Sequence, residues 1–257
     1  MIVKFVDIVG QASIDACDNL GNIFIFLYDT IITMFTTKLK WRKVFSQMNS
    51  IGVNSLSVVV LTGSTVGAVL AWHSYEGLHR FGADTYIGII VFVAMAREFG
   101  PVLASIMVTG RSGSAMTAEI GTMRITEQID ALQTLCIDVK QYLIVPRIVA
   151  TTLILPFLSI FCTFFGVAAG YVIAVMVLKV SSETYLEAMR TNAVIGDITH
   201  GIIKAFIFGF LLSLIGCYKG FVTRGGAKGV GIATTQSVVY ANVTTFIADY
   251  ILTSLMS

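Results

Sequence analysis

The chain has 257 residues, of which 56% are hydrophobic and only 12% are charged. A soluble domain has about 25% charged residues, so this composition excludes a water-soluble globular protein and predicts an all-α protein embedded in a membrane. The net charge of +2 and the lack of a long basic run also exclude a nucleic-acid partner.

The segment before Lys38 carries one polar stripe. The stripe consists of Asp7, Gln11, Asp15, Asp18, Asn22 and Asp29. Residues three, four or seven positions apart share one face of an α-helix. Residues 1–43 are therefore expected to contain an amphipathic helix that lies in the cytoplasmic interface of the membrane. The alternative is a sixth span over residues 19–37, with an external N-terminus.

Five later segments are apolar enough to cross a bilayer, which requires about 20 helical residues. The first and third are the uncharged gaps that follow Lys43 and Arg147. The predicted spans are residues 44–75, 85–110, 148–178, 199–218 and 230–255. Residues 44–257 are thus expected to form a five-span bundle within one integral-membrane domain over 1–257.

The positions of the cations predict the orientation, because Lys and Arg are enriched in cytoplasmic loops. With a cytoplasmic N-terminus, most of the 17 Lys and Arg residues fall inside, and only Arg80, Lys179 and Arg190 fall outside. Five spans then place the C-terminus outside.

Small residues recur every four positions in spans one and three. They are Gly63, Gly67 and Ala71 in the first and Gly166, Gly170 and Ala174 in the third. Such spacing permits close approach of two helix backbones. The contact is expected within one subunit, and a dimer seam is the alternative.

Arg97 and Glu98 fall inside the second span, where an unpaired charge is costly. Neighbouring residues on a helix point about 100° apart, so these two need partners elsewhere. Lys204 and Asp249 are the intramembrane candidates. Such a cluster either fixes helix register or lines a polar path that meets a lipid head group and responds to a transport cycle.

The longest polar connection runs from 111 to 140 and has helix signals of its own. Thr126 is predicted as an N-cap, with Glu127 and Asp130 in the first turn. One apolar side is expected to contain Ile129, Leu132, Leu135 and Cys136. These signals predict a short helix parallel to the membrane. It would either cover the base of the bundle or dock into a partner.

Catalytic and metal-binding motifs are lacking in the sequence. No GxxxxGK[ST] phosphate-binding loop occurs, and the glycine-rich stretch at Lys228 continues with Gly. His73, His79 and His200 have no metal-ligand spacing. We therefore expect no catalytic residue, no metal and no cofactor in this chain, which is not an enzyme.

Four runs resemble one known family. They are REFGPVLA at 97–104, GRSGSA at 110–115, AEIGTMRITEQIDAL at 118–132 and GVGIATT at 229–235, which continues to Asp249. Together with the spacing of the spans, they closely resemble the MlaE-type permeases over essentially the whole chain. These permeases are membrane subunits of ABC-type transporters that move phospholipids between the inner and outer membranes of Gram-negative bacteria and maintain outer-membrane asymmetry.

The resemblance implies a location and several partners. The chain would lie in the bacterial inner membrane, with its N-terminus in the cytoplasm and its C-terminus in the periplasm. It would pair with a second copy of itself and with a P-loop ATPase subunit that holds ATP and Mg. A periplasmic hexamer of MCE-domain proteins, and a STAS-domain protein on the ATPase, would complete the assembly.

The resemblance also implies roles for residues. A coupling helix around 119–136 would dock into the ATPase, through Glu119, Gly121, Arg124, Thr126, Glu127 and Asp130. A lipid cavity between two copies would be lined by Leu70, Tyr75, Leu78, Phe81, Arg97 and Glu98. Ordinary packing or bilayer contact is the alternative for the apolar members of this second set.

Two other functions remain open from the residues. An ion-coupled secondary transporter would use Arg97, Glu98, Lys204 and Asp249 as a relay, and it would work without an ATPase. A purely structural membrane anchor would tolerate changes at Glu98 and Glu127.

Overall fold

The computed structural model describes residues 21–36 and 39–256. Regular structure within these two stretches is helical throughout, which confirms the all-α class. Five helical runs are long and apolar enough to span a membrane, as predicted. They are Trp41–His79 (α2), Asp84–Ile125, Lys140–Val177, Ile195–Phe221 (α9) and Gly226–Met256 (α10).

Two of the runs are composite helices. The second joins η1 (Asp84–Tyr86), α3 (Ile87–Ala94), η2 (Met95–Phe99), α4 (Gly100–Val108), η3 (Thr109–Gly113) and α5 (Ser114–Ile125). The third joins η4 (Lys140–Ile144), α7 (Val145–Val172) and η5 (Ile173–Val177). Of these connecting segments, η2, η3, η4 and η5 are π-helical turns, which insert one extra residue and are frequent at functional sites.

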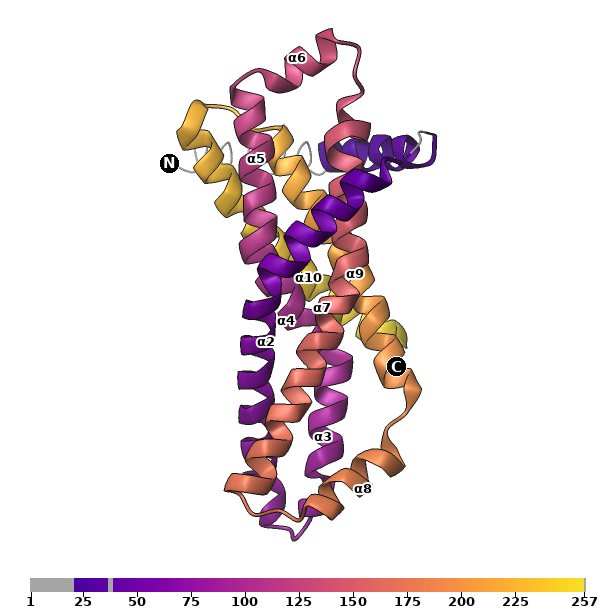
Figure 1. Cartoon of the computed structure of the whole chain (residues 1–257), viewed down its shortest axis with the longest axis vertical. Helices are drawn as coiled ribbons and strands as arrows, with labels where there is room; N and C mark the ends of the chain where they lie inside the picture. Colours follow the sequence, from indigo (N-terminus) through magenta and orange to yellow (C-terminus); the bar gives the residue numbers. More distant parts are fainter. Residues whose placement is uncertain (1–20, 37–38, 257) are drawn as a thin grey trace, which may run out of the picture.

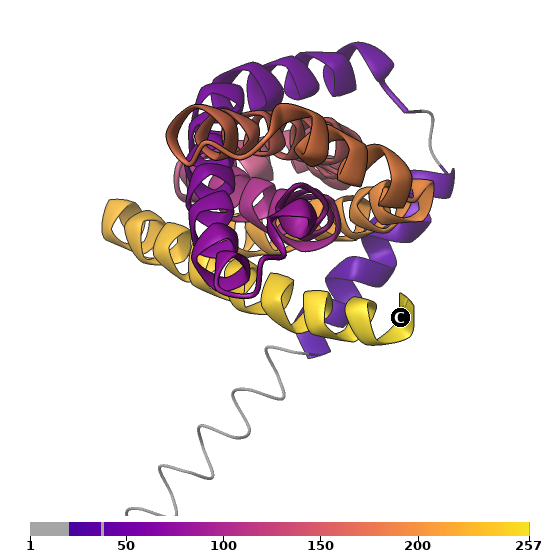
Figure 2. The ribbon, with the colours of Figure 1, turned by 90° about the horizontal axis from the view of Figure 1, so that it is seen from below.

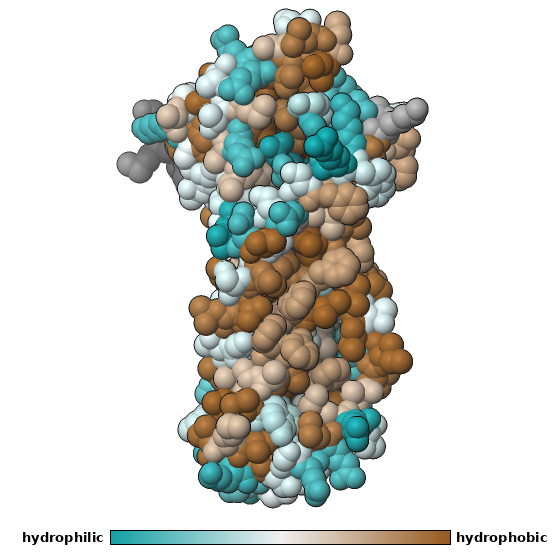
Figure 3. Space-filling model, viewed as in Figure 1, coloured by the Kyte–Doolittle hydropathy of each residue, from teal (hydrophilic) through white to brown (hydrophobic). Residues whose placement is uncertain are grey.

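The runs extend along one long axis, with two short helices at opposite ends (Figure 1). These are α6 (Gln128–Thr134) and α8 (Ser182–Asn192). Seen from the α8 end (Figure 2), α3 lies beside α2 and α8, and it packs against both of them and against α7. Hydrophobic residues cover most of the middle of the visible face, whereas hydrophilic residues gather towards the ends (Figure 3). This distribution fits a bundle that crosses a bilayer.

The N-terminal helix, Gly21–Thr36, lies across the α6 end of the bundle (Figure 1). Phe26 packs against the rings of Tyr218 and Phe221 at the end of α9. Asp29 accepts a hydrogen bond of 2.6 Å from Lys140 Nζ. The described helix is too short to count among the five membrane-spanning runs and crosses the end of the bundle, so it does not form a sixth span beside them. Its location in the membrane interface stays a prediction. The stripe residues 7–18 lie outside the described residues.

Glycine contacts hold α2 against α7 within one subunit, which is the expected packing. A Cβ on Gly67 would overlap the backbone of Gly166, and one on Gly63 would lie 2.7 Å from the carbonyl oxygen of Cys162. Gly170 in turn faces Gly67 and Val91. These glycines pack against other residues of the same chain, so they do not form a dimer seam.

The connection at 111–140 differs from its prediction. The second span does not stop at residue 110, because the helical run continues to Ile125. Thr126 is not an N-cap. It ends α5, and its hydroxyl donates back to the carbonyl oxygen of Thr122. Glu127 then adopts a left-handed conformation with φ of 58°, which separates α5 from α6.

The predicted coupling helix around 119–136 is consequently two helices. Its predicted apolar side is also incomplete. Ile129 is buried and Leu132 is half-buried, but Leu135 is 69% exposed and Cys136 is exposed as well.

Gly67→Ala should reveal the close contact between α2 and α7. We expect the free energy of unfolding in detergent to fall by about 1–3 kcal/mol, because the new methyl group overlaps the backbone of Gly166. Gly77→Ala is the matched control, since Gly77 is on the same helix and has no neighbour within 4 Å. Helix propensity alone should stabilise the control by up to about 1 kcal/mol. A Gly67→Ala protein as stable as the control would contradict this packing.

Candidate functional site

A π-helical turn presents the two intramembrane charges of the second span. Pro101 has no N–H group, so the usual helical bond to the carbonyl of Arg97 is missing. The N–H of Gly100 instead reaches back to the carbonyl oxygen of Met95, which also accepts a bond of 3.2 Å from Thr163 on α7. A Cβ on Gly100 would overlap the hydroxyl of Thr163. Glycine, proline and threonine thus shape this turn together.

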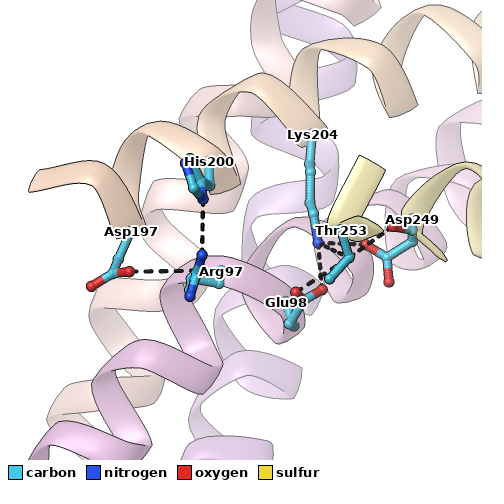
Figure 4. A network of polar contacts seen from close by, with 7 residues as sticks. All are labelled: Arg97, Glu98, Asp197, His200, Lys204, Asp249 and Thr253. Carbon is cyan, nitrogen blue, oxygen red and sulfur yellow. Dashed lines mark hydrogen bonds and ion pairs between the residues drawn. The ribbon is translucent and has the colours of Figure 1, made fainter. Parts of the chain in front are cut away.

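Lys204 of α9 is the centre of the site (Figure 4). Its ammonium donates to Glu98 Oε2 at 2.5 Å, to Asp249 Oδ1 at 2.9 Å and to Thr253 Oγ1 at 2.7 Å. The side chain is 2% exposed, whereas Glu98 and Asp249 are 38% and 21% exposed. An ammonium has three donors, and all three are used here.

Arg97 forms a second group beside the first (Figure 4). Its Nε lies 3.5 Å from Asp197 Oδ1, and its Nη2 donates to His200 Nδ1 at 3.2 Å. Guanidinium nitrogens only donate, so Nδ1 of His200 must accept this bond and cannot carry a proton.

The two groups together hold three acidic and two basic side chains, a formal net charge of −1. The pocket beside them is lined by Arg97, Glu98, His200, Lys204, Thr253 and Met256 and has a volume of only about 10 Å³. Such a space holds one water molecule at most. Lys204 is enclosed within this chain, whereas the side chains of Arg97 and Glu98 are 37% and 38% exposed, so their part in a lipid cavity between two copies stays a prediction.

The sequence identified part of this site. Of the two candidate partners, Lys204 pairs with Glu98, whereas Asp249 pairs with Lys204 and Arg97 finds Asp197 instead. The partners of Arg97 were missed, since span four was expected to begin near residue 199 and α9 already begins at Ile195. Asp197, His200 and Lys204 are three, four and seven positions apart, and this helical spacing would have indicated one shared face.

The apolar residues predicted for a lipid cavity lie elsewhere, near the α8 end of α2. Leu70, Tyr75 and Leu78 are half-buried against the core, and Phe81 is 84% exposed in the following turn. Tyr75 stacks on His79, with ring centroids 4.6 Å apart. This group does not share the pocket of Arg97 and Glu98, so the structure does not unite the predicted cavity residues within one chain.

The residues predicted for coupling divide into two groups. Glu119 accepts a 2.9 Å bond from the buried Arg147, and Gly121 faces Thr223, so both serve contacts within the bundle. At the tip, Arg124 pairs with Asp130 at 2.6 Å. Thr126, Glu127 and Asp130 are exposed there.

Among residues 21–36 and 39–256, no group of three or more His, Cys, Asp or Glu side chains is arranged to hold a metal ion.

Comparisons with known proteins give one consistent family. The family model described as "Permease MlaE" matches residues 44–255. A "Probable ABC transporter permease protein" of Rickettsia bellii is 39% identical over 99% of this chain and 98% of its own length. The "Intermembrane phospholipid transport system permease protein MlaE" of Haemophilus influenzae is 33% identical over 100% of this chain and 98% of its own length. "Protein TRIGALACTOSYLDIACYLGLYCEROL 1, chloroplastic" of Arabidopsis thaliana is 38% identical over 87% of this chain and 64% of its own length.

Lys204→Met should destabilise the protein strongly. It leaves Glu98 and Asp249 facing each other without a cation, and removal of one partner from a buried pair costs about 3–5 kcal/mol. Adding Asp249→Asn should recover part of this loss, because it removes the repulsion between the carboxylates. Unfolding titrations in detergent measure both effects. The exposed Lys228→Met serves as control and should stay within about 0.5 kcal/mol of the parent. Equal stability of the two single variants would contradict a structural role for Lys204.

Proposed function

Since the chain belongs to the MlaE permease family, we propose that it is the membrane subunit of an ABC-type transporter that moves phospholipids between the inner and outer membranes and so maintains outer-membrane lipid asymmetry. The observation that carries this proposal is the match of the family model over 44–255, which includes almost all of the five spans. The name of the Haemophilus relative specifies intermembrane phospholipid transport.

The energy would come from a partner chain. The sequence has no phosphate-binding loop, so ATP and Mg would be held by a separate P-loop ATPase and this chain would not be an enzyme. The docking site is the α6 end, where Glu127, Asp130 and Leu135 project from the bundle. A STAS-domain protein would bind the ATPase and not this chain.

The orientation follows from the same assignment. The N-terminal helix and α6 lie at one end, which would be cytoplasmic, and α8 lies at the other, which would face the periplasm (Figure 1). The chain would lie in the bacterial inner membrane, with its C-terminus towards the periplasmic side and a hexamer of MCE-domain proteins beyond α8. The exposed apolar side chains of α10, among them Phe246 and Tyr250, offer a face to a second copy.

The substrate path would form between the two copies at the α8 end. Phe81 is the most exposed of its predicted lining residues, and Leu70, Tyr75 and Leu78 follow along the same end of α2. Arg97 and Glu98 would act through the charged cluster, which ties the second span to α9 and α10. Movement of these three elements against each other would require these ion pairs to rearrange.

The second candidate function is an ion-coupled secondary transporter in which Arg97, Glu98, Lys204 and Asp249 pass a proton or cation. The ion pairs of Glu98 and Asp249 with Lys204 inside the bundle favour it. The two candidates differ in their source of energy. We expect an ATPase subunit to copurify with this chain, and the reconstituted complex to transfer labelled phospholipid only with hydrolysable ATP. Transfer by this chain alone, driven by an ion gradient, would refute the proposal.

Glu127→Lys and Asp130→Lys should separate the permease from its motor. Both side chains are exposed at the α6 tip, so the fold should be retained while lipid-stimulated ATP hydrolysis by the complex falls at least about tenfold. Glu187→Lys, an exposed site on α8 at the other end, is the matched control. Normal stimulated hydrolysis in both tip variants would contradict docking at α6.

Phe81→Asp should block lipid transfer in reconstituted liposomes, because a carboxylate at the cavity mouth is costly beside acyl chains. Assembly with the ATPase should be unchanged. Ile195→Asp is the control, since Ile195 is equally exposed, at 83%, and begins α9. Transfer by the Phe81→Asp protein at the control rate would show that Phe81 lies outside the lipid path.

A further inference from the structure

An apolar pocket, distinct from the small pocket at the charged cluster, lies between α3, α7, α8 and α9, in the half of the bundle towards α8. Its volume is about 550 Å³, within the roughly 300–1,000 Å³ of typical ligand sites. The lining includes Phe92, Phe164, Val167, Tyr171, Tyr185 and Ile198. None of its lining residues is Lys, Arg, Asp or Glu, so the pocket fits a neutral and mostly apolar group.

This pocket is separate from both sites described above. None of the cavity residues on α2 lines it, and none of the charged cluster does. Its α7 residues, among them Phe164 and Ala168, alternate with Gly166 and Gly170, which meet α2 and α3 on the other side of the helix. The pocket therefore opens on the flank of the bundle.

One polar atom in the pocket wall has no partner. Tyr185 of α8 is fully buried and lines the pocket, and its hydroxyl has no hydrogen-bond partner among residues 21–36 and 39–256. Its ring lies edge-on to Tyr171, whose own hydroxyl is paired with Ser182. Burial raises the pKa of Tyr185 to about 12, so the group stays protonated as a donor. Buried polar groups are normally paired, and no described residue supplies an acceptor for this one.

We propose that the pocket binds one acyl chain of a bilayer glycerolipid and that the Tyr185 hydroxyl donates a hydrogen bond to the ester carbonyl of that chain. The pocket adjoins exposed apolar side chains of membrane-spanning helices, including Phe164 at 64% and Ile198 at 43%. Acyl chains are therefore its neighbours in a membrane. The ester carbonyl is the neutral acceptor at the head of each chain.

The chemistry of the wall excludes a free fatty acid at neutral pH. An ionised carboxylate would enter a pocket without any cationic lining residue, at a high cost in desolvation. The proposal requires only that the chain sits in a bilayer, so it stands independently of the transported substrate and of the ATPase.

Photolabelling tests the site on the full chain in its membrane complex, in nanodiscs of phosphatidylethanolamine and phosphatidylglycerol. The probes are phosphatidylethanolamines with a diazirine in one acyl chain, joined by an ester or by an ether bond. We expect labelled peptides from α7, α8 and α9, with about fivefold more label from the ester probe, the ratio typical of one hydrogen bond. Tyr185→Phe should lower ester labelling to the ether level.

A matched pair of variants tests the pocket itself. Ile198→Trp narrows the mouth and should reduce labelling by both probes at least fivefold. Ile203→Trp is the control, because Ile203 is on the same helix, is 41% exposed and does not line the pocket. Equal labelling of the parent by ester and ether probes would overturn the role of Tyr185. Labelling unaffected by Ile198→Trp, or stronger with a diazirine fatty acid, would overturn the glycerolipid site.

Discussion

The burial of the Lys204 ammonium is the constraint on which the arrangement of the spans depends. A cation that is 2% exposed inside an apolar bundle is stable only when every donor finds an acceptor. Those acceptors come from two other elements, since Glu98 belongs to η2 and Asp249 and Thr253 belong to α10. The register of α9 against both neighbours is therefore fixed by a single side chain.

This polar contact is possible only because the backbones approach closely. Gly201 lies between His200 and Lys204 on α9, and a Cβ there would overlap the carbonyl oxygen of Ala96. The π-helical turn then carries Arg97 and Glu98 to different partners on the same helix. The ion pairs therefore depend on glycine, because Gly201 allows the backbones of α9 and η2 to approach closely enough for them to form.

The sequence predicted best those features that depend on the cost of placing a charge in an apolar segment. The five spans and the pairing of Lys204 were predictable, because few charges occur in apolar stretches and each must be paired. Asp197 was missed because hydropathy placed the start of α9 too late. Thr253 was missed because a hydroxyl in an apolar helix leaves no mark in charge or hydropathy. The break at Glu127 was not predictable, since a left-handed conformation of a non-glycine residue is uncommon.

The full pairing of the Lys204 ammonium bears on how transport would be driven. All three donors of Lys204 are used, His200 accepts from Arg97, and the adjoining pocket holds one water molecule at most. A proton relay would need one of these bonds to break, because protonation of His200 at Nδ1 removes its acceptor and adds a cation beside Arg97. The helical run from η2 continues to α5, and α6 follows at the tip. A force applied by an ATPase at that tip would therefore reach the cluster through the backbone of this helical run.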